Sequence, residues 1–239
     1  EIALKENRNV DFILWPENSV DVDPFLNSDV KKSLDSIKQP LIIGAIVNKG
    51  NTLLNTSILW GGELPETYIK QHLTPFGEYI PLRSLARIVS PLVDEVEDFS
   101  PGDSEKTFEI GAIKIAPVIC YELIDDALLE KAAKNSNILA VQTNSATFGM
   151  SAESAQQLSI TRIRAIEHGR NIASVSTTGY SAIIDSSGKV LQKTSMGTAD
   201  SIRATVDLIE GQTPRDRAGD WALIGVLAAL FLVARRAYI

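Results

Sequence analysis

The segment Ile113–Asn144, IKIAPVICYELIDDALLEKAAKNSNILAVQTN, joins two apolar runs through one helical pattern. The runs IKIAPVIC and NILAVQTN are almost continuously apolar, which is typical of strands covered on both faces. Between them, DDALLEKAAKNS has apolar residues at helical spacing. Asp125 and Asp126 suit the start of that helix, where carboxylates cap free N–H groups. The segment therefore indicates a strand, a helix and a second strand.

The same mixture continues on both sides of this segment. Further strands are predicted at VDFILW, PLIIGAIV, TLLNTSILW, NIASVSTTG and SAIID, and further helices at DPFLNSDVKKSLDSIK and AESAQQLSITRIRAIEHGR. DSSGKVLQKT predicts a hairpin, because a Ser-Ser-Gly turn lies between short β-rich arms. Strands and helices that mix throughout the chain predict the α/β class with a layered core.

Composition limits the possible functions. The 239 residues are 44% hydrophobic and 22% charged, as in an ordinary globular protein, and the net charge is −7. An acidic chain without a lysine–arginine stripe is not expected to bind nucleic acid. The single cysteine, Cys120, excludes an internal disulfide and a cysteine-rich zinc site. It is either a small buried hydrophobe or a reactive thiol.

Three residues are of the types that acyl transfer needs. Glu17 follows an apolar strand in FILWPENSV, Cys120 ends another strand, and Lys70 lies in TYIKQHLTPFGEYIPL (Thr67–Leu82) together with Glu78. A lysine near a thiol favours the thiolate, and a partly desolvated glutamate can accept the thiol proton. Taken singly, these residues would be interpreted as a loop carboxylate, a core thiol and a surface lysine.

Neither a metal nor a cofactor is predicted. The two histidines, His72 and His168, are too few for a histidine-rich metal site, and neither lies in an HExxH pattern. GxSxG, Walker A and GxGxxG motifs are also missing from the sequence. We interpret His72 as a structural hydrogen-bonding residue.

Several motifs carry a family resemblance. WPEN, KQHLTPFGEYIP and ICYE, in that order, resemble the nitrilase superfamily, and LPETYIKQHLTPFGEYIPL resembles its apolipoprotein N-acyltransferase branch. RAIEHGRN and TTGYSAIIDSSGKVL resemble two further signatures of that branch. The resemblance extends from about Glu1 to Gln212. It implies an α/β, nitrilase-like four-layer αββα sandwich, followed by a C-terminal transmembrane helix.

The resemblance also implies a role for each matching residue. Glu17 matches the general base and acid, Lys70 the stabiliser of the transition state, and Cys120 the nucleophile. The supporting residues are Glu78, Tyr121 and Glu122. Glu78 would position the Lys70–Cys120 pair, and Tyr121 and Glu122 lie beside the nucleophile, where the Tyr121 backbone N–H is a candidate oxyanion donor.

The implied reaction is a two-step acyl transfer without a cofactor. Cys120 would take a fatty acyl chain from a phospholipid as a thioester. It would then pass the chain to the α-amine of a diacylglyceryl-cysteine lipoprotein. The protein is expected to act as a monomer in the bacterial inner membrane, with its catalytic domain on the extracytoplasmic side.

Three positions depart from the branch. NSATFG (Asn144–Gly149) stands where N-D-x-W-F-G is common, so Ser145 and Thr147 replace an acidic and an aromatic residue. Thr177 replaces an asparagine in STTG. These changes leave the proposed triad intact and bear on substrate contacts and on the lipid pocket.

The two ends of the chain predict further organisation. Residues 1–9 have the pattern of a helix already under way, so the catalytic domain, residues 1–212, is expected to lack its first strand and an upstream membrane portion. Residues 213–220 are expected to be a linker. Residues 221–239 begin with fourteen uncharged residues, which are followed by Arg235 and Arg236, and are expected to span the membrane.

Two other functions stay open on the sequence. A soluble amidase of the nitrilase superfamily would use the same triad with water as the acceptor and a small amide as the substrate. A membrane-tethered binding module would keep the fold without the catalysis.

Overall fold

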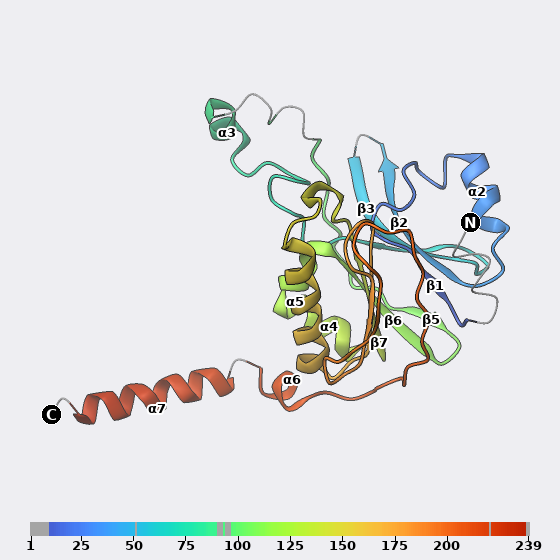
Figure 1. Cartoon of the computed structure of the whole chain (residues 1–239). Helices are drawn as coiled ribbons and strands as arrows, with labels where there is room; N and C mark the ends of the chain where they lie inside the picture. The colour runs from blue at the N-terminus through green and yellow to red at the C-terminus, as the bar shows by residue number, and fades with distance from the viewer. Residues whose placement is uncertain (1–9, 51, 90–92, 94–96, 220, 238–239) are drawn as a thin grey trace.

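The computed structural model describes residues 10–50, 52–89, 93, 97–219 and 221–237. The helix expected at residues 1–9 lies outside this range. The described chain forms two β-sheets, flanked by helices, and a helix that extends from the body at the C-terminal end (Figure 1).

The first sheet has the strand order β1-β2-β3-β4. Its strands are β1 (Ile13–Leu14), β2 (Leu41–Lys49), β3 (Thr52–Trp60) and β4 (Glu66–Ile69). β1 pairs with β2 in parallel, whereas β2, β3 and β4 pair antiparallel. The predicted strands in this half of the chain are confirmed.

The second sheet has the order β10-β9-β8-β7-β6-β5. Its strands are β5 (Phe108–Ile110), β6 (Ile113–Ile119), β7 (Ile138–Thr143), β8 (Ile172–Ser176), β9 (Ala182–Ile184) and β10 (Val190–Lys193). β6, β7 and β8 pair in parallel, and the antiparallel β9–β10 pair is the predicted hairpin. The almost continuous apolar runs belong to the central parallel strands, which are buried on both faces.

Side chains alternate between two faces of each sheet and so build a layered core. Ile42 of β2 packs with Ile115 and Ile119 of β6 between the two sheets. The neighbouring residues along these strands face the opposite way, toward the helices. Leu41 packs on the side of α2 (Ser28–Asp35), and Val118 packs on the side of α4 (Asp126–Lys134) and α5 (Glu153–His168). The predicted four-layer αββα arrangement is confirmed.

Two short helices lie in the long connections. α3 (Arg83–Val89) stands out from the body after the Thr67–Leu82 stretch (Figure 1). α6 (Pro214–Ala218) lies within the residues expected to be a linker. Proline suits its first turn, and the Thr213 hydroxyl accepts the Asp216 N–H at 3.1 Å as an N-cap.

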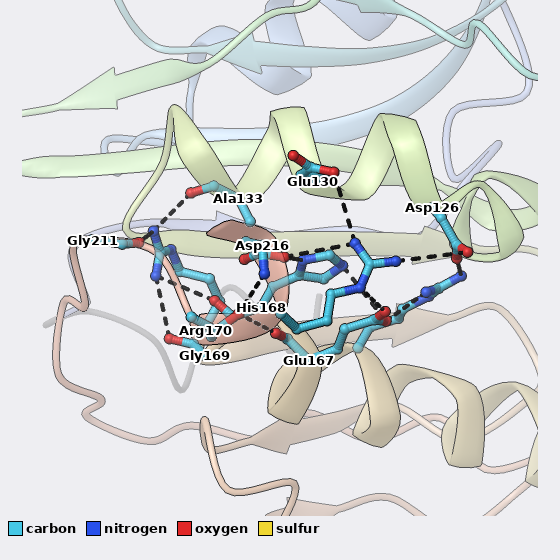
Figure 2. A network of polar contacts seen from close by, with 12 residues as sticks. Asp126, Glu130, Ala133, Glu167, His168, Gly169, Arg170, Gly211 and Asp216 are labelled. Carbon is cyan, nitrogen blue, oxygen red and sulfur yellow. Dashed lines mark hydrogen bonds and ion pairs between the residues drawn. The ribbon is translucent and has the colours of Figure 1, made fainter. Parts of the chain in front are cut away.

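Buried and half-buried polar contacts fix α6 against α5 (Figure 2). Asp216 Oδ1 lies 2.9 Å from His168 Nδ1, and both side chains are almost fully buried. On the outer side, Arg215 Nε lies 2.8 Å from Glu167 Oε1. Arg164 Nη2 lies 2.6 Å from Asp126 Oδ1 of α4. This α4–α5–α6 network makes α6 part of the domain surface.

The last described helix is α7 (Trp221–Ala237), which extends away from the two sheets (Figure 1). Its exposed side chains include Trp221, Leu227, Leu230 and Phe231. In the described part of the chain, the structure has no helix with the length and apolar character needed to cross a membrane.

Candidate active site

Three chain segments that follow strand ends meet at one place between the sheets. Glu17 lies three residues after β1, Lys70 directly follows β4, and Cys120 directly follows β6. Only 5% of Glu17 and 1% of Lys70 are exposed, and Cys120 is partly buried. The structure therefore brings together the three residues that the sequence singled out.

Lys70 lies between two carboxylates. Its Nζ is 3.3 Å from Glu17 Oε1 and 2.7 Å from Glu78 Oε2. Burial alone would lower the pKa of Lys70, but the charges of Glu17 and Glu78 outweigh it and hold this pKa above its ordinary value. Lys70 is therefore a protonated, buried cation.

The loop after Lys70 folds so that Glu78 points back to it. The Thr74 N–H donates to Glu78 Oε2 at 2.7 Å, and Lys70 Nζ donates to the Thr74 hydroxyl at 3.3 Å. Burial raises the pKa of Glu78, but Lys70 and the hydrogen bonds outweigh it, so that this pKa lies below its ordinary value. Glu78 is thus an ionised partner that holds the lysine in place.

Cys120 occupies a strained backbone position. Its φ of +49° lies in the left-handed region, which is uncommon for residues with a Cβ, and it opens the 3₁₀ helix η2 (Cys120–Ile124). Burial, together with the charge of Glu17, raises the pKa of the thiol to about 12, and Lys70 only partly opposes this rise. At neutral pH the resting sulfur therefore keeps its proton, although the lysine was expected to favour the thiolate.

Two neighbours besides Lys70 act on the thiol. Glu17 raises the pKa of Cys120, and the backbone N–H of Asn144 lowers it. Glu17 is therefore placed to take the proton from Sγ, and Asn144 is placed to donate to the sulfur.

The two residues after Cys120 contact residues on both sides of Lys70. Glu122 is fully buried and accepts hydrogen bonds from Tyr68 Oη and the Gln71 N–H at 2.7 Å each. Burial raises the pKa of Glu122, although these bonds oppose the rise. The ring centroids of Tyr121 and His72 lie 5.2 Å apart, in an edge-to-face arrangement.

The His72 side chain also makes the polar contact expected for a structural residue. Its Nδ1 lies 2.8 Å from Asp125 Oδ2. Asp125 in turn caps α4 by accepting the Leu128 N–H, as the sequence predicted.

One residue of the site was missed by the sequence reasoning. Asn55 of β3 is 2% exposed, and its Nδ2 donates to Glu17 Oε1 at 2.8 Å and to Glu78 Oε1 at 2.6 Å. It thus connects the two carboxylates that flank Lys70. The available signal was an asparagine within the apolar strand TLLNTSILW, because a buried amide needs polar partners.

A comparison with known families identifies the family of this chain. The family model for carbon-nitrogen hydrolases matches residues 3–215. The chain belongs to the carbon-nitrogen hydrolase family. The structure of Saccharomyces cerevisiae Nit3, a member of branch 10 of the nitrilase superfamily, is similar with a TM-score of 0.61 at 20% identity, over 82% of this chain and 77% of that one. The structure of an amidase from Nesterenkonia sp. AN1 is also similar, with a TM-score of 0.60 at 17% identity, over 78% of this chain and 76% of that one.

Similar curated proteins are named apolipoprotein N-acyltransferase. The protein from Mycolicibacterium smegmatis is 35% identical over 77% of this chain and 33% of its own length. The protein from Azotobacter vinelandii is 30% identical over 99% of this chain and 48% of its own length. The chain thus spans between a third and a half of the length of these relatives.

The three residues that depart from the branch pattern have different surroundings in the structure. Ser145 is 1% exposed and lies among other hydroxyl groups, whereas Thr147 is exposed. The Thr177 hydroxyl donates to Asn144 Oδ1 at 2.8 Å. Within the described residues, no group of three or more His, Cys, Asp and Glu side chains is arranged to hold a metal ion.

Proposed function

We propose that this chain is the catalytic part of an apolipoprotein N-acyltransferase. It would move a fatty acyl chain from a phospholipid, through a thioester on Cys120, to the α-amine of a diacylglyceryl-cysteine lipoprotein. The observation that carries the proposal is the meeting of Glu17, Lys70 and Cys120, in which the charges of Glu17 and Lys70 both act on the thiol. The names of the similar curated proteins support N-acyl transfer to an apolipoprotein.

In the first step, Glu17 accepts the proton of Cys120 as Sγ attacks the ester carbonyl carbon. The raised pKa of Cys120 makes this base necessary, since a thiolate is not present beforehand. The Lys70 ammonium and the Tyr121 backbone N–H stabilise the oxyanion. The ester C–O bond then breaks, and Glu17 returns the proton to the departing glycerol oxygen, which leaves a lysophospholipid and an acyl thioester.

In the second step, the lipoprotein amine attacks the thioester carbonyl carbon. Glu17 accepts a proton from the amine, the C–S bond breaks, and the sulfur leaves as a thiolate that takes the proton from Glu17. The products are the amide and the resting thiol. Glu78 and Asn55 act in both steps by holding Lys70 and Glu17.

We also propose that α7 attaches the catalytic domain to the inner membrane, with the domain on the extracytoplasmic side. Residues 213–220 would be the connection, although α6 within them packs on the domain. The helix α7 carries exposed apolar side chains at Trp221 and from Ile224 to Val233. Its 17 residues reach about 25 Å, somewhat less than the hydrocarbon thickness of about 30 Å. Trp221 suits an interface at one end and Arg235 at the other. The protein is proposed to act as a monomer.

The test is mass spectrometry of the protein after incubation with phospholipid vesicles. A mass increase of one acyl chain on the peptide that contains Cys120, lost on adding a diacylglyceryl-cysteine peptide, is the expected result. Cys120→Ala is the control and should show neither event. An unmodified thiol in a preparation that N-acylates the peptide would exclude the thioester route. Release of free fatty acid or of ammonia from a small amide, without peptide acylation, would favour the amidase.

A further inference from the structure

A side chain from α5 reaches the sulfur of Cys120. Gln157 is partly buried, and its Nε2 lies 3.9 Å from Cys120 Sγ, within the range of a hydrogen bond to sulfur. The Glu17–Lys70–Cys120 set does not include it. Gln157 comes from a helix on the outer layer of the second sheet, whereas Glu17 and Lys70 follow strands of the first sheet.

A chain of hydrogen bonds sets which end of the Gln157 amide faces the sulfur. The Gly179 N–H donates to Ser176 Oγ at 3.2 Å, and Ser176 Oγ donates to Ser145 Oγ at 3.2 Å. Ser145 Oγ then donates to Gln157 Oε1 at 3.5 Å. Because the carbonyl oxygen of the amide accepts from this chain, its NH₂ group is the end that points to Cys120.

The hydroxyl groups of this chain pack closely around a glycine. A Cβ at Gly179 would lie 2.7 Å from Ser176 Oγ and 2.9 Å from Ser145 Oγ. Any larger residue there would push these hydroxyls apart. Ser145, one of the departures from the branch pattern, is therefore a member of a packed hydrogen-bonded chain that ends at the nucleophile.

We propose that Gln157 donates an N–H to Cys120 Sγ and stabilises the thiolate whenever negative charge develops on the sulfur, with Ser145 as its positioning residue. The inference rests on the thioester chemistry proposed above. Charge develops on Sγ twice, when Glu17 takes the thiol proton and when the C–S bond of the thioester breaks. An amide neither gains nor loses a proton at these steps, so Gln157 stabilises the charge while Glu17 alone moves the proton.

Iodoacetamide alkylation of Cys120 tests this assignment, because it reports thiolate formation without requiring acyl transfer. In Gln157→Leu, which keeps the bulk and removes the donor, the alkylation rate at neutral pH should fall about tenfold, as for the loss of one hydrogen bond. Gln157→Glu should lower the rate further, because a carboxylate repels the thiolate. Ser145→Ala should give a smaller fall.

The matched control is Gln156→Leu, since Gln156 is the exposed neighbour on the same helix. It should leave the alkylation rate unchanged. Equal rates for Gln157→Leu, Gln157→Glu and the control variant, each with a native thermal unfolding curve, would overturn the inference. The outcomes for the two proposals are separate. A rate lowered by Gln157→Leu, in a protein that forms no acyl thioester, would support the Gln157 contact and reject the acyltransferase.

Discussion

Lys70 Nζ lies 2.7 Å from Glu78 Oε2, and both side chains are removed from solvent. With Glu17 at 3.3 Å on the other side, one buried cation serves two carboxylates. The ammonium group is therefore fixed in position and in charge before any substrate arrives. Such a preorganised cation is most effective where an oxyanion forms, because no solvent has to reorganise around it.

Replacement of this cation should remove activity and stability together. In Lys70→Met, two buried carboxylates lose their counter-ion. We expect the free energy of unfolding to fall by about 3–5 kcal/mol and acyl transfer to fall by about 10²-fold or more. Urea unfolding and a transfer assay measure the two effects. Lys131→Met removes only an exposed ion pair with Glu105 and should cost about 1 kcal/mol or less. A Lys70 variant with full activity would contradict the assigned role.

Removal of the base should make the thiol easier to deprotonate. Burial raises the pKa of Cys120 most and the charge of Glu17 raises it further, so Glu17→Gln should lower this pKa part of the way toward its ordinary value. At about pH 9, below the raised pKa, the variant should be alkylated faster than the native protein. Acyl transfer should nevertheless be lost, since the base is gone. Slower alkylation in the variant would show that Glu17 does not act on the sulfur as described.

Asn55 should tolerate neither an apolar nor an acidic replacement. Asn55→Leu removes two hydrogen bonds to charged oxygens and is expected to cost about 2–5 kcal/mol of unfolding free energy. Asn55→Asp places a third carboxylate beside Glu17 and Glu78, and we expect it to be the more harmful for transfer. Thermal unfolding and transfer rates compare the two variants. If Asn55→Asp proves as active as the native protein, the amide is not the link between the two glutamates.

The network at α6 should affect stability without affecting chemistry. Asp216→Ala removes the hydrogen-bond partner of the buried His168 Nδ1, and a loss of about 1–3 kcal/mol is expected. Glu130→Ala, which loses a partly exposed contact with Arg215 at 3.7 Å, should cost about 1 kcal/mol or less. Below the unfolding transition, both variants should form the Cys120 thioester at the native rate. A thioester defect in the Asp216 variant alone would mean that α6 influences the site.

Local patterns were sufficient for most of the fold. The segment Ile113–Asn144 predicted β6, α4 and β7, because apolar runs and helical spacing are properties of adjacent residues, and Asp125 was predicted as a cap on the same grounds. β5 has only three residues, too few to show the alternation typical of a strand. The proline and the flanking glycines around α6 favour a linker in the sequence. The helix is nevertheless stable there because Asp216 pairs with His168, which is distant in the sequence.

The site was predicted as far as motifs identify residues. Glu17, Lys70 and Cys120 were recognised from their order and neighbours. Asn55 was not, because its partners Glu17 and Glu78 lie 38 and 23 residues away and only the fold brings them together. The protonation of Cys120 was also inaccessible, since it depends on how burial and two opposite charges balance in space.

The left-handed backbone at Cys120 sets stability against reactivity at a single position. Glycine would adopt this φ of +49° without steric cost, whereas a residue with a Cβ costs roughly 1 kcal/mol or more there. For folding alone, glycine would thus be the better residue here, and the proposed thioester chemistry is what requires the costlier cysteine. Cys120→Gly should accordingly be inert but melt at a higher temperature than Cys120→Ala. The glycine form would be the more durable scaffold for holding an unreacted acyl donor.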